Sequence, residues 1–553
     1  MTHGPDAPAR PTPPARRRRS ALRVPPGPRG LAILLLTVVG AALAPAARAT
    51  AQPVGPPLPE SMRPPLSIEL TYDPSVTDTY TGPVFVVFSA GGPPFLVPRP
   101  FDRSPIIRVD VTDWRPDDPL TIDASNATCA PMDFDEIQPG RYFLQAFMVL
   151  APGSYKPGTP GNAGSATIAT QADAFDSVPF RLRIDRLVRA PRLPDDGSNR
   201  IVTEVFRSDL LSDFHGTDVE LGYTVVLPPG YFIESDRMYP TRFWIGAHGT
   251  DHHVGTRVLQ PLEEFEGGND IVTVLLKVTT RFGHPLYVDS ASSGPWARAL
   301  LEEVIPRLER EYRLDPRGRF LSGHAAGGWT ALSLQLNHPE VFAGAWATAP
   351  WPTSFASWFG TDLYDVENAF VRSDGSPRRY GVWQDGRPTE PARITWHRER
   401  VVGAGGMFGS FEWAFSPPGP DGRPRPFFDP ATGAVDREVV EHWSRYDLAR
   451  LVERRGADLA TAIGDDPIVI TVGGRDGFRL AEPVQHLVDA MSAAGIAVEH
   501  DYLPEGGHAD IATMPYQMAA LKAMVDRFWD ITGGEVPRVG DARPKPAGSG
   551  GGG

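Results

Sequence analysis

The sequence predicts a mostly parallel, doubly wound α/β domain at about residues 200–532, preceded by a small all-β, sandwich-like domain at 66–190. From residue 200 onward, strand-like apolar runs alternate with stretches of helical spacing, which is typical of a parallel sheet covered by helices on both faces. Before residue 190, short apolar runs with partial alternation are separated by Pro, Gly and Asp turns. A short strand that runs into a glycine-rich turn and then a helix, at 319–337, marks the middle of the α/β part.

The all-β domain is predicted from five candidate strands that lie between turn residues. A polar connector at 191–199 separates it from the α/β domain. The expected strands lie at 67–71, 84–89, 106–111, 142–150 and 179–184.

In the α/β domain the expected strands and helices alternate along the chain. A long irregular insertion at about 350–450 interrupts this pattern and is expected to form a cap, and residues 533–553 are expected to be a disordered tail. The expected strands lie at 219–227, 241–247, 271–278, 319–322, 343–347, 467–472 and 498–503. The expected helices lie at 296–312, 481–494 and 514–529, and a further helix is expected to follow the turn at 323–328 and to end at about residue 337.

The composition limits the classes of function. The chain has 553 residues, of which 41% are hydrophobic and 22% are charged, so it can form more than one globular core. Its net charge of −13 repels phosphate backbones, so we expect no nucleic-acid partner. The single cysteine, Cys129, excludes an internal disulfide and a cysteine-based metal finger.

The N-terminus has the layout of a bacterial secretory signal. Arginines at 16–19 and 23 precede an apolar run at 31–44, and small residues at 47, 49 and 51 offer cleavage sites. We therefore expect a secreted or periplasmic protein, with 1–51 as the signal segment and 52–65 as a linker. The partial twin-arginine pattern at 18–22 leaves both Tat and Sec export open. An uncleaved anchor is the alternative, although the run is short for a bilayer and we expect no stable membrane insertion.

The turn at 323–328 has the layout of a nucleophile elbow. Serine hydrolases place the nucleophile on such a tight turn between small residues, and the helix that follows helps to stabilise the oxyanion. The segment Gly323-His324-Ala325-Ala326-Gly327 matches this pattern except that Ala325 stands at the nucleophile position. Downstream, Asp476 follows the strand at 467–472 and His508 follows the strand at 498–503, which is the order expected for the acid and the base.

These segments resemble the "Putative esterase" family of α/β-hydrolases, which is related to esterase D and enterochelin esterase. The residues at 289–296 and 302–315 before the elbow also resemble such proteins, and the resemblance covers roughly 200–530. It implies an α/β-hydrolase fold with Ala325 at the position of the catalytic serine, Asp476 as the acid and His508 as the base. It also implies that an oxyanion and substrate-binding group is formed by Gly249, Thr250, Ala326 and His324.

The alanine at position 325 decides what activity to expect. It has no hydroxyl and cannot form an acyl-enzyme; loss of the nucleophile in a serine hydrolase costs on the order of 10⁶ in kcat. We therefore expect an exported protein of the carboxylic-ester hydrolase type, with weak or absent serine-type activity. Its ligand would be a small-molecule or glycan-linked ester, and no cofactor is expected.

Several other interpretations stay open at this point. The site could bind a ligand without turning it over, or the dense cluster of His248, Asp251, His252 and His253 could hold a metal that activates water. Ser322 could replace the missing nucleophile, although a position inside a strand favours a core role. The serines at 290, 292 and 293 precede a helix and are expected to cap it. Six tryptophans in the insertion could form a ligand-stacking lid, but a small core of the insertion itself is the favoured interpretation.

Overall fold

The computed structural model describes residues 66–89, 104–138, 140–151, 159–171, 179–189, 199–250, 252, 270–383, 386–403 and 405–540. The expected signal segment at 1–51 and the linker at 52–65 lie outside these residues.

The first domain is all-β, as predicted, and its strands form one sheet in the order β4-β1-β9-β7-β6-β2-β3-β5, with β8 paired to β6. Ile122 of β4 and Cys129 of β5, from opposite ends of this order, share one buried core, so the sheet curls around it. All five predicted strands are present. The strands missed by the sequence analysis are those of three or four residues, too short to show alternation. The strands are β1 (Ile68–Tyr72), β2 (Tyr80–Ser89), β3 (Ile106–Trp114), β4 (Leu120–Ile122), β5 (Thr128–Ala130), β6 (Arg141–Met148), β7 (Ala163–Ser165), β8 (Ile168–Gln171) and β9 (Phe180–Leu187).

The second domain is built on an eight-stranded sheet in the order β10-β11-β13-β12-β16-β17-β18-β19. Only the pairs β10–β11 and β11–β13 are antiparallel; the other neighbours are parallel. Numbered along the chain from β10, this is the order 1-2-4-3-5-6-7-8 of the α/β-hydrolase fold, so the predicted fold is confirmed. The strands are β10 (Ile201–Arg207), β11 (Glu220–Val226), β12 (Tyr239–Ile245), β13 (Val272–Leu276), β16 (Leu314–His324), β17 (Ala345–Thr348), β18 (Ile468–Gly473) and β19 (Glu499–Leu503).

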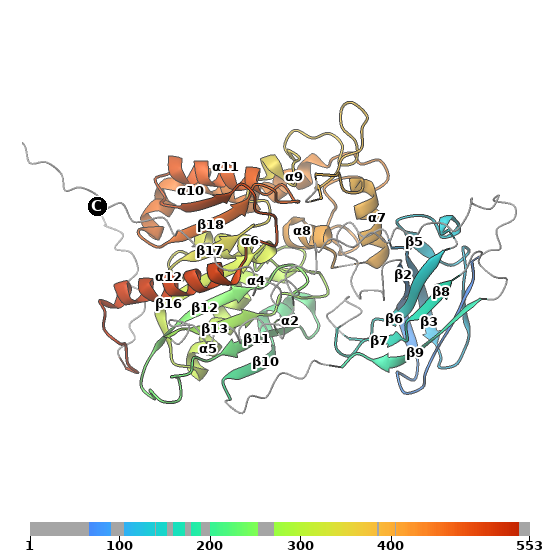
Figure 1. Ribbon diagram of the computed structural model, residues 1–553, viewed down its shortest axis with the longest axis horizontal. Coiled ribbons are helices and arrows are strands. Elements are labelled where there is room, and N and C mark those ends of the chain that lie inside the picture. The colour runs from blue at the N-terminus through green and yellow to red at the C-terminus, as the bar shows by residue number, and fades with distance from the viewer. Residues whose placement is uncertain are drawn as a thin grey trace, which may run out of the picture.

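Helices cover both faces of this sheet because successive strand residues point to opposite sides. On β18, Ile470 packs in the core that includes α6, α10 and α11, whereas the adjacent Val469 packs against α12 on the other face (Figure 1). The sequence analysis missed β10, α2 and α10 and made β16 too short. The helices of this domain are α2 (Asp209–His215), α4 (Trp296–Ala299), η7 (Leu300–Val304), α5 (Ile305–Glu311), α6 (Ala326–Asn337), α10 (Leu448–Ile463), α11 (Ala481–Ala493) and α12 (Met514–Thr532).

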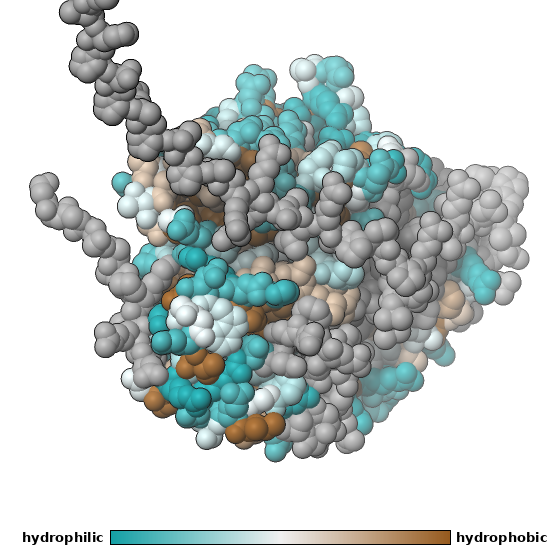
Figure 2. Space-filling view, turned by 60° about the vertical axis from the view of Figure 1, so that its left-hand side comes forward, coloured by the Kyte–Doolittle hydropathy of each residue, from teal (hydrophilic) through white to brown (hydrophobic). Residues whose placement is uncertain are grey.

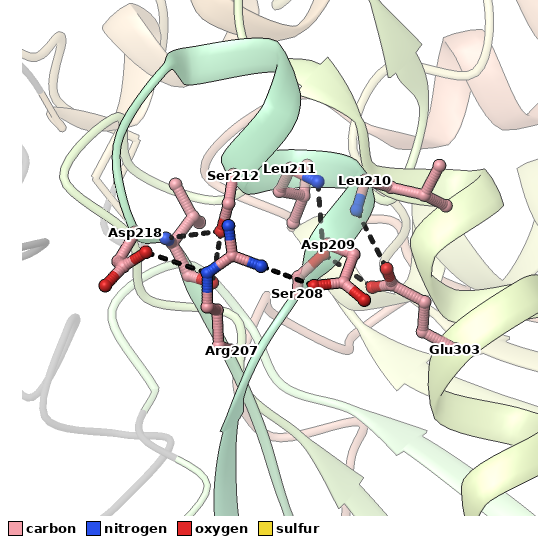
Figure 3. Close-up of polar contacts among 9 residues, drawn as sticks. Arg207, Ser208, Asp209, Leu210, Leu211, Ser212, Asp218 and Glu303 are labelled. Atoms are coloured by element: carbon pink, nitrogen blue, oxygen red, sulfur yellow. Dashed lines mark hydrogen bonds and ion pairs between the residues drawn. The ribbon is translucent and has the colours of Figure 1, made fainter.

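The first helix of this domain, α2, is fixed at its N-terminus by side chains (Figure 3). The Ser208 hydroxyl caps the helix by accepting the Leu211 N–H at 3.1 Å. Glu303 of η7 accepts the Leu210 N–H at 2.9 Å and the Ser208 hydroxyl proton. Since Glu303 comes from the segment between α4 and α5, these bonds tie α2 to that helical segment.

The predicted cap is present, but it is not irregular: it contains α7 (Ala392–Val402), α8 (Met407–Phe415), α9 (Arg437–Trp443) and the short turns η8 (Phe355–Ser357) and η9 (Ser444–Tyr446). Its helices were not predicted because Pro- and Gly-rich loops separate them. Four of the six tryptophans are buried, in a core that the cap shares with α6, α10 and α11 rather than in a core of its own, and two are half-buried. The buried ones are Trp351, Trp358, Trp396 and Trp443, and the half-buried ones are Trp383 and Trp413.

The cap also carries the contact with the all-β domain, which lies beside α7 (Figure 1). His397 of α7 bonds through Nε2 to the Cys129 carbonyl oxygen at 3.0 Å, and Arg108 donates to the Val401 carbonyl oxygen at 3.3 Å. Val401 is buried together with Phe85 on the outer face of the β sheet. The all-β domain therefore contacts the α/β domain through the cap.

The surface shown in Figure 2 is largely hydrophilic, with hydrophobic residues in separate patches. Within the part of the chain that the structure describes, no helix has both the length and the apolar character needed to span a membrane. Part of the segment expected to be a disordered tail is paired instead: the Met238 N–H donates to the Pro537 carbonyl oxygen at 2.9 Å, and the Val539 N–H to that of Asp236 at 2.8 Å. Residues 541–553 lie outside the described chain.

Candidate active site

The elbow lies where β16 ends and α6 begins. Ala325 has φ 53° and ψ −115°, a conformation that costs a residue with a side chain about 1–3 kcal/mol. Three backbone bonds hold it: its N–H donates to the Thr348 carbonyl oxygen at 3.0 Å, and its carbonyl oxygen accepts from Trp329 and Trp351, each at 3.0 Å. The backbone at Ala325 is therefore strained and firmly held, as expected at the tight turn of a nucleophile elbow, and the side chain there is a methyl group.

The small residues around the elbow are required by close backbone contacts. A Cβ on Gly323 would lie 2.3 Å from the Gly327 carbonyl, and a Cβ on Gly327 would lie 2.0 Å from the Ile245 carbonyl oxygen. Both separations are far below van der Waals contact, so only glycine fits. These contacts pack α6 directly on the ends of β12 and β16.

The predicted acid and base meet at this edge of the sheet. His508 Nδ1 lies 2.8 Å from Asp476 Oδ2, and both side chains are buried. The other carboxylate oxygen of Asp476 accepts the Phe478 N–H at 2.8 Å, and the Phe478 ring packs edge-on against His508 at 4.7 Å. Because the carboxylate accepts the Nδ1 proton, Nε2 of a neutral His508 carries a lone pair, as a general base requires.

His324 lies beside this pair, with its ring centroid 4.8 Å from that of His508. The Thr348 hydroxyl donates to the Gly323 carbonyl oxygen at 3.3 Å, so it accepts from His324 Nδ1 at 3.0 Å. Nε2 of His324 is therefore a buried acceptor, and among the described residues it has no hydrogen-bond partner. Burial, and secondarily the nearby His508, lower the pKa of His324 well below its ordinary value, so the ring is neutral.

The oxyanion donors agree with the sequence only in part. The Ala326 N–H is the first amide of α6, so it has no acceptor within the helix and lies at the positive end of the helix dipole. The Thr250 N–H, by contrast, donates to the Ala247 carbonyl oxygen at 3.0 Å and closes a turn. The Thr250 amide is therefore occupied in this structure. The oxyanion and substrate-binding role of Thr250, like that of Gly249, which has φ 86° in the same turn, stays a prediction.

The cap anchors this loop. His248 Nε2 lies 3.2 Å from the Gly405 carbonyl oxygen, and its ring stacks on Trp351 at 6.1 Å. Trp351 in turn stacks on Phe411 of α8 at 4.4 Å. The sequence analysis singled out Trp351 only as one of the six tryptophans of the insertion, and it missed Thr348. The available signal was their place: Thr348 is the last residue of β17, next to the elbow strand, and Trp351 follows shortly after it.

The histidine cluster at 248–253 is only partly visible, because Asp251 and His253 lie outside the described residues. In the described chain, no group of three or more His, Cys, Asp or Glu side chains is arranged to hold a metal ion. Metal-assisted chemistry at this cluster stays a prediction.

The serines considered as replacements are engaged elsewhere. Ser322 Oγ accepts the Arg242 Nε–H at 2.7 Å on the face of the sheet under α12. Ser290 Oγ donates to the Trp413 carbonyl oxygen at 2.7 Å and accepts from Ser292 and Ser293, both at 3.1 Å. The expectation that these serines cap the following helix is wrong: its N-cap is Pro295, and Ser290 instead closes the preceding turn and binds the cap.

The α/β domain matches a known family. Residues 215–476 match the model of the family described as "Putative esterase", a match that includes the elbow and Asp476 and ends before His508. No curated protein sequence matches the chain.

Solved structures with a similar fold include several esterases. A ferulic acid esterase is 15% identical with a TM-score of 0.38, and the match covers 59% of this chain and 98% of that one. The Staphylococcus aureus fluorophosphonate-binding serine hydrolase FphF is 18% identical with a TM-score of 0.35, over 59% of this chain and 98% of its own. An S-formylglutathione hydrolase from Agrobacterium tumefaciens is 16% identical with a TM-score of 0.35, and the match covers 59% of this chain and 96% of that one.

These similarities are too low to transfer a substrate, and the assignment rests on the family match together with the strand order and the elbow. Over residues 215–476, the α/β domain of this chain is similar to the "Putative esterase" family of α/β-hydrolases.

Proposed function

We propose that this chain is an exported protein of the carboxylic-ester hydrolase type whose site receives an ester or acyl ligand but does not form an acyl-enzyme. The observation that carries the proposal is the elbow at Ala325, which keeps the strained backbone of a nucleophile position next to a hydrogen-bonded His508–Asp476 pair. A strained conformation persists only where the surrounding structure enforces it. The strained backbone and the His508–Asp476 pair are therefore retained around a residue that cannot react.

The roles of the remaining groups follow from their geometry. An ester carbonyl above Ala325 would direct its oxygen toward the Ala326 N–H at the positive end of α6, which favours a developing negative charge. His508, with a free lone pair on Nε2, would face the attacking side. With serine at this position, His508 would take the hydroxyl proton, the oxygen would attack the carbonyl carbon, and the alkoxide would leave as the alcohol after receiving that proton. With alanine the first bond cannot form.

A second candidate is slow hydrolysis by direct attack of water. It is favoured by the imidazoles of His324 and His508, which lie next to each other. In both rings Nδ1 is bonded to an oxygen, so Nε2 is the acceptor of the neutral form. A water molecule donating to His508 could attack an ester held at the Ala326 N–H. The residual rate of serine hydrolases without their nucleophile, about 10³–10⁴ above that in water, sets the scale for such a reaction.

Export is part of the proposal and is supported by the basic, apolar and small-residue pattern of 1–51. The negative net charge favours an uncharged or cationic ester over a nucleic acid. Expression of the full chain in a bacterial host, followed by fractionation and N-terminal sequencing, tests this part. A mature N-terminus near residue 52 in the periplasm or medium is expected, and an intact N-terminus in the membrane fraction would contradict it.

The catalytic part is tested by hydrolysis of a short-chain aryl ester by the purified protein and its Ala325→Ser variant. We expect the protein to stay at or below the residual rate and the variant to gain up to about 10⁶ in kcat, the cost of losing this nucleophile elsewhere. Adding His508→Ala to the variant should abolish the gain, whereas Ser322→Ala in the unmodified chain should change nothing at the site. Activity of the unmodified chain far above the residual rate would overturn the proposal.

A further inference from the structure

His284 lies in the segment between β13 and α4, and all three of its nitrogen atoms make hydrogen bonds. The residue is 2% exposed. Its backbone N–H donates to Ser410 Oγ of α8 at 3.0 Å. The ring nitrogen Nδ1 accepts the Leu286 N–H at 3.0 Å, and Nε2 lies 3.0 Å from the Gly246 carbonyl oxygen. This residue therefore joins the segment after β12, its own turn and the cap.

These bonds define the state of the imidazole. Because Nδ1 accepts a proton from Leu286, it cannot carry one itself. The ring is therefore the neutral tautomer with its proton on Nε2, and Nε2 donates to the Gly246 carbonyl oxygen. The imidazole is thus a donor to Gly246 and an acceptor from Leu286 at the same time.

The acceptor side of the ring holds a strained turn. Leu286 and Tyr287 have φ values of 50° and 45°, in the left-handed region that residues other than glycine rarely adopt. The Tyr287 hydroxyl is also fixed, because it donates to the Lys277 carbonyl oxygen at 2.9 Å. Such a turn persists only where surrounding bonds enforce it. The bond between Leu286 and the His284 ring therefore fixes both the turn and the ring.

The donor side of the ring reaches the elbow. The Gly246 carbonyl oxygen lies against the first turn of α6, since a Cβ on Gly327 would be 2.8 Å from it. Gly246 also begins the turn at 246–250, and a Cβ on it would lie 2.8 Å from the Thr250 Cβ. The orientation of the Gly246 carbonyl therefore matters both to this turn and to the start of α6.

The start of α6 attracts a nearby carbonyl oxygen. Its first amides have no acceptor within the helix, and they lie at the positive end of the helix dipole. One of them is the Ala326 N–H, the donor that the proposed function assigns to the ligand. A buried Gly246 carbonyl without a partner would compete for this donor, because an unpaired buried carbonyl costs about as much as a lost hydrogen bond.

We propose that His284 is a positioning residue of the ester site: by binding the Gly246 carbonyl oxygen, it keeps the Ala326 N–H available for the carbonyl oxygen of an ester. This role rests on the proposed function, which gives the Ala326 amide its task. His284 does not touch the ligand and acts only through the Gly246 peptide. Loss of its Nε2–H should therefore weaken stabilisation of the transition state more than binding of the ester.

The kinetic test uses the Ala325→Ser variant as the active background. His284→Asn keeps an acceptor near the position of Nδ1 but is too short to reach the Gly246 carbonyl oxygen. We expect kcat to fall by up to about 10²-fold with little change in KM, since loss of one oxyanion donor costs about 10²–10³ in kcat. The loss should be smaller for the matching thionoester, because sulfur is a weak hydrogen-bond acceptor. His284→Gln, whose longer amide can donate to Gly246, should restore most of the rate.

His397→Asn is the matched control. Nε2 of His397 also bonds to a carbonyl oxygen at 3.0 Å, that of Cys129, at the contact with the all-β domain. Its loss should leave kcat and the ratio of ester to thionoester hydrolysis unchanged. Unchanged kcat in His284→Asn, or equal losses on the ester and the thionoester, would overturn the proposal.

A crystal structure of His284→Asn in the unmodified chain tests the same role without catalysis. We expect the Gly246 carbonyl oxygen to lie within hydrogen-bond distance of the Ala326 N–H, and an unmoved carbonyl would overturn the proposal. His284→Met, which fills similar space without a donor, takes the place of His284→Asn in both tests if that variant does not fold. An inactive Ala325→Ser variant would contradict the proposed function alone, and the crystal structure would still decide the role of His284.

Discussion

The edge of the sheet and the cap are held together in different ways. At the edge, backbone meets backbone: Gly327 lies against the Ile245 carbonyl, and Ala325 is held by three main-chain bonds. In the cap, aromatic side chains meet one another, with Trp358 touching the rings of Phe359, Tyr380, Phe408, Phe411, Phe427 and Trp443. Positions at the edge of the sheet therefore tolerate few residue types, whereas positions in the cap could accept other large side chains.

The largest expected effect on stability in this comparison comes from the cap. Trp358→Ala removes a completely buried ring from the centre of the aromatic cluster and should cost about 3–5 kcal/mol. Urea unfolding followed by intrinsic fluorescence measures this loss. Trp383→Ala, at a half-buried position in the same cap, should cost clearly less, and equal losses would show that the cap is not organised around Trp358.

A smaller but more local effect is expected at the edge. Gly327→Ala places a methyl group 2.0 Å from the Ile245 carbonyl oxygen, so α6 must shift, at a cost of about 1–3 kcal/mol or somewhat more. In the Ala325→Ser background the same change should also remove esterase activity, since the elbow moves with the helix. Gly230→Ala, where the nearest atom would be 3.4 Å away, should leave both stability and activity intact.

The smallest expected effect is the pH dependence of the cap. Burial raises the pKa of Glu412 to about 8 and that of Glu399 to about 7, from the ordinary glutamate value of 4.5. The unfolded chain loses these protons near pH 4.5, whereas the folded chain keeps them until about pH 7 to 8. The free energy of unfolding should therefore fall as the pH rises from about 4.5 to 8. Glu412→Gln should flatten this fall, as read from Tm between pH 5 and 8. An unchanged pH profile would mean that Glu412 is not buried as described.

The same division explains what the sequence could predict. The elbow at 323–328 and the order of Asp476 and His508 were predictable because short motifs at strand ends specify them. The occupation of the Thr250 amide could not be predicted, because it depends on a single turn hydrogen bond to the Ala247 carbonyl oxygen. The helix α10 was missed although Leu448, Leu451, Val452, Leu459 and Ile463 repeat with helical spacing, because it directly follows a cap whose end had no sequence signal. Nothing in the strand pattern around Arg242 indicated a buried charge.

The central claim is that the chain carries a serine-hydrolase site that lacks only the reactive oxygen. It is tested most directly by incubating the protein and its Ala325→Ser variant with a fluorophosphonate and measuring intact mass and peptide adducts. The account predicts no adduct on the unmodified chain and one stoichiometric adduct on the variant, located on the peptide that contains position 325 and lost when His508→Ala is added. An adduct on the unmodified chain, or a folded variant that is not labelled, would contradict it.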